Sequence, residues 1–361
     1  MKSQLSLVII ILLLGLSCSQ NSDIGIGKYN PEITSTENLI AFVQLPENAE
    51  NEFPWNREIY LLNSENGMLK RLTFDQFEDE DLAWSPTGDR IIFTSKRSLR
   101  PRARFNEGNN PSYLCIYDFS TKSERILNKN LTDGIISLGQ NLKNEGYEIN
   151  YNSDRRLRLS SPYWISANLL GCRIQLPFGI GRAYGDLCTF DTLGNNLDVI
   201  TEIFEQPDWR IMWPVWINED SILVNLMSKN NSNGKNAVAI YLKKEMQFVR
   251  LTSESSKVSS PSLARNSRQI IFLERKKADK LTSLIILDLK NNKRKSIDID
   301  LEGVTGPELS PNGRKLAFFK SNEQVWGDDI YIMNINGTNI MRMTHNGGLK
   351  GSLRWSPNTS Y

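Results

Sequence analysis

Histidine and net charge are both scarce in this 361-residue chain. It has one histidine, His345, and 43 Lys and Arg residues against 41 Asp and Glu residues. One histidine cannot build a site in which several imidazoles hold a metal, so we expect no metal site and no cofactor. A protein that covers DNA or RNA carries a marked basic excess. The near balance of charge therefore argues against a nucleic acid as partner.

Two motifs of catalytic and redox sites are also missing. The sequence contains no Gly-x-Ser-x-Gly, the nucleophile motif of α/β-hydrolase domains, and no Cys-x-x-Cys. A hydrolase domain of that class and a Cys-x-x-Cys redox or metal site are thus excluded, and no catalytic residue can be named from a motif.

The one long hydrophobic run stands at the N-terminus, where only Ser6 interrupts residues 5–14. It is shorter than the roughly 20 residues that span a bilayer and fits the apolar region of a signal peptide. The run ends in Gly15-Leu-Ser-Cys18, which resembles the lipobox of bacterial lipoproteins, where the cysteine is lipidated. We predict a signal peptide over 1–17, lipidation of Cys18 and a flexible tether over 18–37. The residues alone leave ordinary secretion and an uncleaved anchor open.

The resemblance to lipoproteins also implies a location. Ser19 and Gln20 follow Cys18, whereas the inner-membrane retention signal of that family is an aspartate. The implied location is the cell envelope, at the outer membrane, with the domain facing the periplasm or the exterior.

The rest of the chain repeats one pattern. In its clearest copy, residues 83–95, a strand ends at Trp84, a Ser-Pro-Thr-Gly turn follows, and a second strand starts at Ile91. Pro presets φ for such a turn and Gly accepts a positive φ. The spacings between successive anchors are 80, 52, 47, 46 and 46 residues, and the anchors are Trp84, Trp164, Trp216, Leu263, Leu309 and Trp355.

The two ends of the chain complete the count of repeats. Residues 353–358 read as a first strand without a continuation, and residues 38–43 as a second strand without a first. Joining them gives six units: 351–361 with 38–73, 82–127, 162–201, 212–252, 259–298 and 305–344. Such closure removes the open sheet edges of a propeller. The sequence therefore predicts an all-β fold over 38–361, a six-bladed β-propeller closed by pairing of the C-terminal strand with the N-terminal strands.

The repeat resembles that of TolB-like six-bladed β-propellers. The shared elements are Trp-Ser-Pro-x-Gly, Ile-x-Phe-x-Ser, Ile-Tyr and Arg-Leu-Thr, at residues 84–95, 309–320, 329–334, 70–73 and 249–252. The resemblance covers 38–361 and implies the fold more than a function, because these motifs mark strands and turns. TolB also has an N-terminal α/β domain, and we expect no counterpart because the expected propeller starts at residue 38.

The cysteines after Cys18 fall on expected strands. Cys172 and Cys188 lie on neighbouring strands of one blade, so two states are open in an oxidising compartment, thiols and a disulfide. Cys115 stands where other blades place tyrosine, which predicts a buried apolar side chain. Residues 128–161 lengthen the link between the second and third blades, and a functional loop and a disordered one are both open there.

The expected binding surface lies on one face of the ring. Loops between blades, and loops that join second and third strands, share this face, where propellers usually bind. Aromatic, basic and histidine side chains in these loops are the candidates: Phe53, Trp55, Arg100, Arg102, Trp209, Trp326 and His345. Asp79, Glu80 and Asp81 precede Trp84, and we interpret this acidic run as a solvated loop between blades.

Two functions remain after these exclusions. The first is a monomeric, membrane-tethered module that binds an envelope protein or a glycan without catalysis. The alternative is a carbohydrate-active lyase or hydrolase that uses loop carboxylates. An enzyme should gather ionisable groups with shifted pKa values at the channel mouth. A binding module should instead present an aromatic or charged patch without such a cluster.

Overall fold

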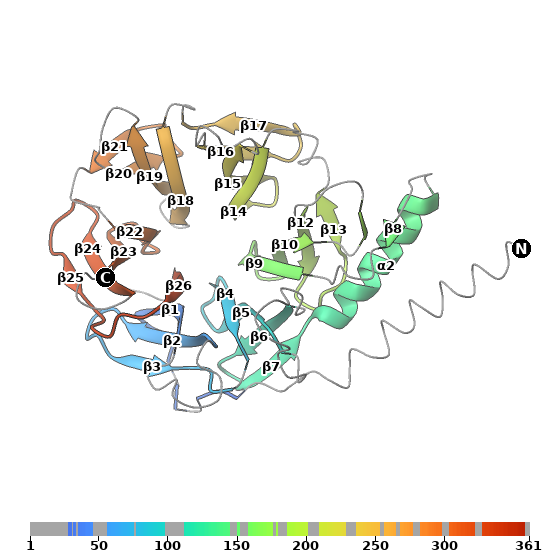
Figure 1. Cartoon of the computed structure of the whole chain (residues 1–361), viewed down its shortest axis with the longest axis horizontal. Helices are drawn as coiled ribbons and strands as arrows, with labels where there is room; N and C mark the ends of the chain where they lie inside the picture. The colour runs from blue at the N-terminus through green and yellow to red at the C-terminus, as the bar shows by residue number, and fades with distance from the viewer. Residues whose placement is uncertain are drawn as a thin grey trace, which may run out of the picture.

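The structure is a computed structural model. It describes residues 28–30, 32–33, 35–45, 56–75, 77–97, 112–144, 150–151, 158–175, 178–179, 186–200, 209–228, 236–252, 256–264, 268–276, 282–297, 303–321 and 327–357. Six four-stranded antiparallel sheets surround a common centre as the blades of a propeller (Figure 1). The predicted fold class, an all-β six-bladed propeller, is confirmed.

Each blade runs outward from an innermost strand, in chain order except in blade 1, where the C-terminal strand β26 is innermost. The first three blades have these strands: in blade 1, β26 (Lys350–Trp355), β1 (Leu39–Gln44), β2 (Glu58–Asn63) and β3 (Leu69–Arg71); in blade 2, β4 (Asp79–Trp84), β5 (Arg90–Ser95), β6 (Tyr113–Asp118) and β7 (Ser123–Ile126); in blade 3, β9 (Arg158–Trp164), β10 (Leu169–Gln175), β12 (Asp186–Asp191) and β13 (Asp198–Ile200).

The other three blades have the same order of strands. They are: in blade 4, β14 (Trp209–Asn218), β15 (Ser221–Ser228), β16 (Asn236–Leu242) and β17 (Gln247–Arg250); in blade 5, β18 (Ser256–Ala264), β19 (Gln269–Lys276), β20 (Ser283–Asp288) and β21 (Arg294–Ile297); in blade 6, β22 (Val304–Leu309), β23 (Lys315–Ser321), β24 (Asp328–Asn334) and β25 (Met341–Arg342). A separate two-stranded sheet pairs β8 (Asn150–Tyr151) with β11 (Phe178–Gly179).

The ring closes in blade 1, where the two ends of the chain meet. Strand β26 pairs with β1 in antiparallel register, so that Trp355 lies opposite Ile40 and Arg354 opposite Ala41. This is the predicted closure. The innermost strands begin earlier than the predicted unit boundaries at 82, 162, 212 and 259. The first residues of β4 and β18 carry little apolar alternation, the pattern by which a strand is recognised in sequence, whereas those of β14 do alternate.

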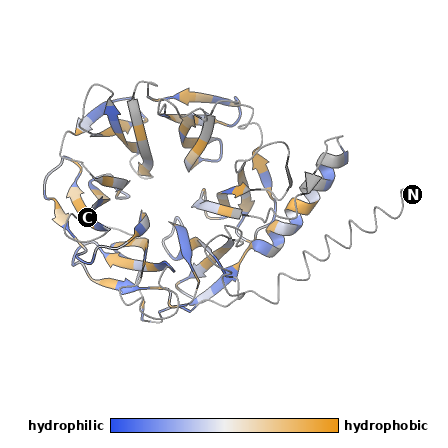
Figure 2. Ribbon diagram, in the orientation of Figure 1, coloured by the Kyte–Doolittle hydropathy of each residue, from blue (hydrophilic) through white to orange (hydrophobic). Residues whose placement is uncertain are grey.

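Hydrophobic residues are distributed over all six blades (Figure 2). They form five buried clusters, and each cluster joins neighbouring blades. The core is therefore a ring of contacts between blades. Two anchor tryptophans add hydrogen bonds to it: Trp84 Nε1 donates to the carbonyl of Arg354 in blade 1 at 3.2 Å, and Trp355 Nε1 donates to that of Glu308 in blade 6 at 3.0 Å.

The predicted Ser-Pro-x-Gly turn holds the first two strands of a blade together. In blade 2, Ser85 Oγ accepts the backbone N–H of Arg90 at 3.0 Å, and Gly88 has φ of 72°. In blade 6, Ser310 Oγ accepts the N–H of Lys315 at 2.9 Å. The positive φ explains the glycine, because residues with a Cβ rarely adopt it.

A second device ties the end of each outer strand to the third strand. Four side chains each accept a backbone N–H 14 residues earlier in the chain, in blades 1, 2, 4 and 6. The acceptors are Thr73, Asn128, Thr252 and Thr344. The threonine of the Arg-Leu-Thr repeat thus satisfies a buried donor that the sheet ladder leaves unpaired.

The long link after blade 2 contains a helix that the sequence analysis did not predict. Helix α2 (Asn128–Asn144) runs along the outside of blades 2 and 3 (Figure 1). Leu131 and Ile135, one turn apart, are buried in the cluster that joins these blades. A Cβ at Gly134 would lie 3.1 Å from Leu197 Cβ, so glycine permits this close approach.

The described part of the N-terminal segment packs on blades 1 and 2. Asn30 N donates to the carbonyl of Leu72 at 2.8 Å, Tyr29 stacks on Tyr117 with ring centroids 4.1 Å apart, and Ile33 is buried. These residues belong to the range 18–37 predicted as a tether. No helix among the described residues has the length and apolarity needed to cross a membrane.

Candidate binding site at the inner rim

The six innermost strands share a local irregularity that no sequence motif marks. In all six blades the pairing of the first two strands shifts register, with one extra residue on the innermost strand. Such β-bulges re-aim side chains and are frequent beside functional sites. Five residues in these bulges have positive φ, and we call them the inner rim: Asp81, Ser161, Trp213, Gly306 and Ser352.

Trp213 is the unusual member of the inner rim. Its φ of 47° is an outlier for a bulky side chain, and its side chain is 45% exposed. Strand β14 contacts β9 on one side and β18 on the other, so its open edge faces the centre of the ring (Figure 1). Trp213 is therefore an exposed residue on the strand nearest the axis of the propeller. Backbone strain of this kind is found where function requires a set orientation.

Asp81 links blades 1, 2 and 3 at the inner rim. Its Oδ2 accepts the backbone N–H of Ser161 at 2.8 Å, and its Oδ1 accepts Ser352 Oγ at 3.3 Å. Burial lowers the pKa of Arg173, and the Asp81 charge opposes this shift. Asp79–Asp81 were interpreted as a solvated loop, and that interpretation is wrong, because they begin strand β4 and Asp79 is fully buried.

A second carboxylate ties the rim on the other side of the closure. Glu308 Oε2 accepts Ser262 Oγ of blade 5 at 2.6 Å and lies 3.5 Å from Arg354 Nη1 of blade 1. The inner rim and the neighbouring Glu308 thus combine fixed polar groups with one exposed aromatic ring, that of Trp213. Such a surface can bind a ligand that offers a flat apolar face and hydrogen-bonding groups at its edge.

Three described carboxyl groups have strongly raised pKa values. Glu58 and Asp79 lie in the seam between blades 1 and 2, with Asp79 two residues before Asp81 on β4, and burial raises the pKa of Glu124 on β7 to about 7. Burial, with the Asp79 charge adding to it, raises the pKa of Glu58 to about 8. Burial and Asp75 raise the pKa of Asp79 to about 7. Glu58 is 1% exposed and Asp79 0%. Both carboxyl groups are closed to a substrate.

Charges at the edge of this seam are paired. Lys96 Nζ lies 2.7 Å from Glu78 and 3.1 Å from Glu80. Arg57 contacts the same two carboxylates, at 3.2 Å for Glu78. Among the described residues, no group of three or more His, Cys, Asp or Glu side chains is arranged to hold a metal ion.

The structure describes two of the predicted site residues, Trp209 and His345, so the predicted binding surface stays a prediction. Trp209 is the first residue of β14. His345 is exposed and follows Thr344 at the end of blade 6. The others lie outside the described residues: Cys18, Phe53, Trp55, Arg100, Arg102 and Trp326.

One sequence signal could have pointed to Trp213. Trp213 and Trp216 are three residues apart on one strand, a spacing that puts them on opposite faces unless a bulge intervenes. Trp216 is the predicted anchor and is buried. Trp213 is thus the tryptophan of the pair that the repeat anchors do not explain.

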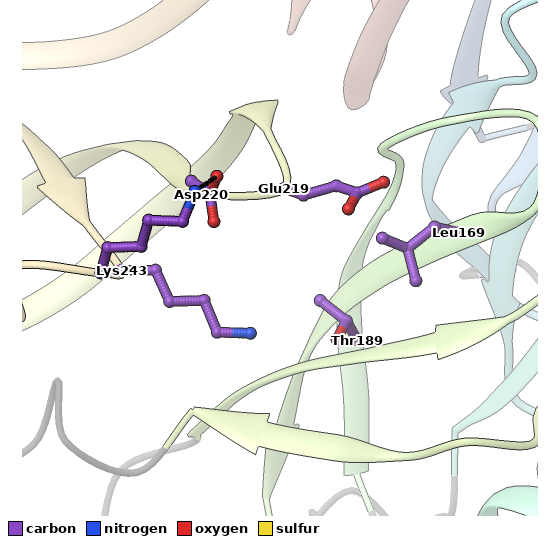
Figure 3. A pocket seen from close by; sticks show the side chains of 6 residues that line it. Leu169, Thr189, Glu219, Asp220 and Lys243 are labelled. Atoms are coloured by element: carbon purple, nitrogen blue, oxygen red, sulfur yellow. Dashed lines mark hydrogen bonds and ion pairs between the residues drawn. The ribbon is translucent and has the colours of Figure 1, made fainter.

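A groove of about 470 Å³ lies between blades 3 and 4 (Figure 3). Its lining consists of Leu169, Thr189, Glu219, Asp220, Lys243 and Lys244. Lys244 Nζ contacts Asp220 at 2.7 Å, and Lys243 Nζ contacts Asp198 at 2.8 Å. The lysines are already paired and the lining holds no aromatic ring, so this groove is a weaker candidate than the inner rim.

Comparisons with known proteins place the fold. No family model and no curated protein matches the chain. TolB from Acinetobacter baumannii is similar, with a TM-score of 0.58 and 13% identity over 90% of this chain and 67% of that one. A putative TolB from Agrobacterium tumefaciens has a TM-score of 0.54 and 11% identity, over 89% of this chain and 92% of that one.

A structure described as oligogalacturonate lyase in complex with manganese is also similar. Its TM-score is 0.50, with 10% identity over 80% of this chain and 70% of that one. Identities this low show a shared architecture and leave activity open. The chain thus has the six-bladed β-propeller fold found in TolB.

Proposed function

We propose that this chain is a monomeric cell-envelope propeller, tethered to the outer membrane through lipidated Cys18, that binds a protein or a glycan without catalysis. The observation that carries the proposal is Trp213, an aromatic ring 45% exposed on strained backbone at the inner rim. Exposed aromatic rings held in a fixed orientation are favoured contact residues at binding surfaces.

The burial of the carboxyl groups with raised pKa values supports binding over catalysis. A catalytic carboxyl group must reach its substrate. Glu58 and Asp79 have raised pKa values but are enclosed between blades 1 and 2. The described rim carboxylates Asp81 and Glu308 are held by hydrogen bonds from neighbouring blades. Their arrangement suits a rigid scaffold around the axis.

The alternative is a carbohydrate-active lyase or hydrolase, for which Asp81 is the carboxylate best placed. It lies at the inner rim, partly exposed, and the buried guanidinium of Arg173 is within its electrostatic reach. A lyase would need a base beside a cation, and a hydrolase would need a second carboxyl group as well. The Asp81→Asn variant tests this alternative, because it removes the charge and keeps the shape.

The test of the proposal places a photocrosslinking amino acid at position 213 of the full chain in its native envelope. We expect a discrete adduct from position 213 and none from position 246, because Met246 is 64% exposed but lies in the turn between β16 and β17. Equal adducts at both positions would overturn the proposal. Turnover of an oligosaccharide by the wild type, lost in Asp81→Asn, would establish the enzyme instead.

The membrane tether is tested on the same material. Cys18→Ser should abolish incorporation of a labelled fatty acid and move the chain from the membrane fraction to the soluble fraction, because two or three acyl chains are needed for firm anchoring. Unchanged fractionation of Cys18→Ser would overturn the tether. The binding proposal would then depend on the crosslinking result alone.

A further inference from the structure

Two cysteines of blade 3 face each other across the sheet. Cys172 on β10 and Cys188 on β12 are directly opposite partners in the antiparallel pairing. Their Sγ atoms are 3.4 Å apart, and both side chains are fully buried. A disulfide has sulfur atoms about 2.05 Å apart, so the structure holds two thiols already in contact.

The surroundings favour no other use of this pair. Both sulfurs lie in the apolar cluster that joins blades 2 and 3, together with Trp164 and Phe190. Metal binding needs further ligands, and the described residues offer no cluster of three. Directly opposite residues of antiparallel strands have Cβ atoms about 4.5–5.5 Å apart, slightly more than a disulfide requires. A small approach of β10 and β12 would close the bond.

Cys115 provides a contrast within the same chain. It is equally buried, and burial raises the pKa of its thiol to about 12. Its cross-strand partners are Phe93 and Ile126, so no second sulfur lies opposite. The sequence analysis predicted a buried apolar role for Cys115, and its burial is confirmed.

We propose that Cys172 and Cys188 are joined by a disulfide in the mature protein. The inference rests on the proposed envelope location, because disulfides persist in oxidising compartments. The bond would connect the second and third strands of blade 3, the strands that flank β11 in the chain.

The reaction is thiol–disulfide exchange with an oxidised dithiol carrier protein. One cysteine thiolate attacks the carrier disulfide, forms a mixed disulfide and releases one carrier thiol. The second thiolate attacks the first cysteine sulfur and releases the other carrier thiol. Two protons and two electrons leave the pair, and the carrier disulfide takes up both electrons. Because both sulfurs are fully buried in the folded chain, the exchange precedes closure of β10 on β12.

The experiment counts thiols by differential labelling. The full chain from the envelope is denatured and alkylated with iodoacetamide, reduced, and then labelled with N-ethylmaleimide. We expect Cys115 to carry the first label and the pair to carry the second. Before reduction, the peptides of Cys172 and Cys188 should be linked and 2 Da lighter than their sum. The first label on all three cysteines would overturn the inference.

A second sample tests whether the disulfide can form independently of the cellular location of the chain. Purified, reduced full chain is unfolded and refolded in a mixture of reduced and oxidised glutathione, and the bond should form there too. If it forms in neither sample, the inference fails, and fatty-acid labelling of Cys18 still tests the location. If the disulfide forms only on refolding, the proposal that it is present in the mature protein is overturned. The chain would then reside in a reducing compartment, which counts against the proposed function.

Thermal unfolding supplies a matched control. A disulfide restricts the unfolded chain, so reductant should lower the midpoint of the wild type by about 5 °C. Cys115→Ser should show the same drop, because its bridge is intact. A Cys172→Ser and Cys188→Ser double variant should show none. Equal sensitivity of all three proteins to reductant would contradict the proposal.

Discussion

Blades 1 and 6 end with the same motif but surround it differently. In blade 1, Arg71 Nη2 contacts Glu58 Oε1 at 2.9 Å, and its Nε donates to the carbonyl of Thr73 at 2.7 Å. In blade 6, Arg342 Nη2 contacts Asp329 Oδ2 at 2.5 Å, and its Nε donates to the carbonyl of Thr344 at 3.0 Å. The repeat thus builds the same arginine-to-acid contact twice.

The difference lies in what else touches the acid. Asp329 Oδ1 accepts Thr344 Oγ1 at 3.0 Å and the N–H of Gly347 at 3.1 Å, so both of its oxygens have donors. Glu58 Oε2 has no hydrogen-bond partner among the described residues. Burial and the Asp79 charge raise the pKa of Glu58, and the Thr73 hydroxyl and Arg71 offset only part of that rise. The same motif therefore holds an acid with donors on both oxygens in blade 6 and an acid whose pKa is raised to about 8 in blade 1.

The largest expected effect comes from removing the arginine in each blade. Arg342→Ala should lower the free energy of unfolding by about 3 kcal/mol, because it leaves the fully buried Asp329 carboxylate without its cation. Arg71→Ala should cost only about 1 kcal/mol at pH 6.5, because Glu58 with a pKa of about 8 is mostly neutral there and loses one hydrogen bond. Urea unfolding of both variants measures the difference.

The pH dependence of the same two variants provides an internal control. The cost of Arg71→Ala should grow as pH rises through 8, where the wild-type glutamate ionises and uses the arginine. The cost of Arg342→Ala should stay constant over that range. Equal costs for both variants at pH 6.5 would show that the two blades hold their acids in the same state.

The second effect is a fall in stability as the solution becomes more alkaline. Glu58 and Asp79 have folded pKa values of about 8 and about 7, above the ordinary 4.5 and 3.8. A folded state that binds more protons loses stability as pH rises between the ordinary and the raised pKa values. Between pH 5.5 and 8.5 the fall is about 3 kcal/mol for Glu58 and about 2 kcal/mol for Asp79.

One substitution in each blade isolates the contribution of Glu58 to this loss of stability with rising pH. Glu58→Gln should flatten the profile and raise stability at pH 8.5, since the amide need not ionise. The matched change Asp329→Asn should lower stability at every pH, because it replaces a well-coordinated carboxylate. A wild-type profile that rises from pH 5.5 to 8.5 would contradict the assignment of Glu58 and Asp79.

Local chemistry and spacing were sufficient to predict the turns and the closure. Ser85 and Gly88 behave as their residue types require, and Trp355 pairs with Ile40 as the incomplete repeats at the two ends indicated. These features depend on neighbours along the chain or on the number of repeats. They are therefore visible in one sequence.

The features that were missed depend on contacts between distant segments. The acidic run at Asp79 is typical of a solvated loop until the seam with blade 1 buries it. Helix α2 is an exception, because Leu131, Ile135, Leu138 and Leu142 follow helical spacing, a local pattern that was overlooked. The exposure of Trp213 follows from a bulge and from the open edge of β14, and neither has a local motif.

The smallest effect tests whether the threonines of the two blades are equivalent. Thr73→Val removes the acceptor of the Ile59 N–H, a hydrogen bond of 2.9 Å, and should cost about 1 kcal/mol because a buried donor is left unpaired. Thr344→Val removes the same acceptor from Ile330 and also the 3.0 Å bond to Asp329 Oδ1, so it should cost more. Thr252→Val of blade 4, which loses the bond from Val238 N at 3.0 Å, is the reference without an acidic neighbour in the bond. If Thr344→Val costs no more than Thr252→Val, the hydroxyl contributes nothing to holding Asp329, and the contrast between the two blades rests on the arginines alone.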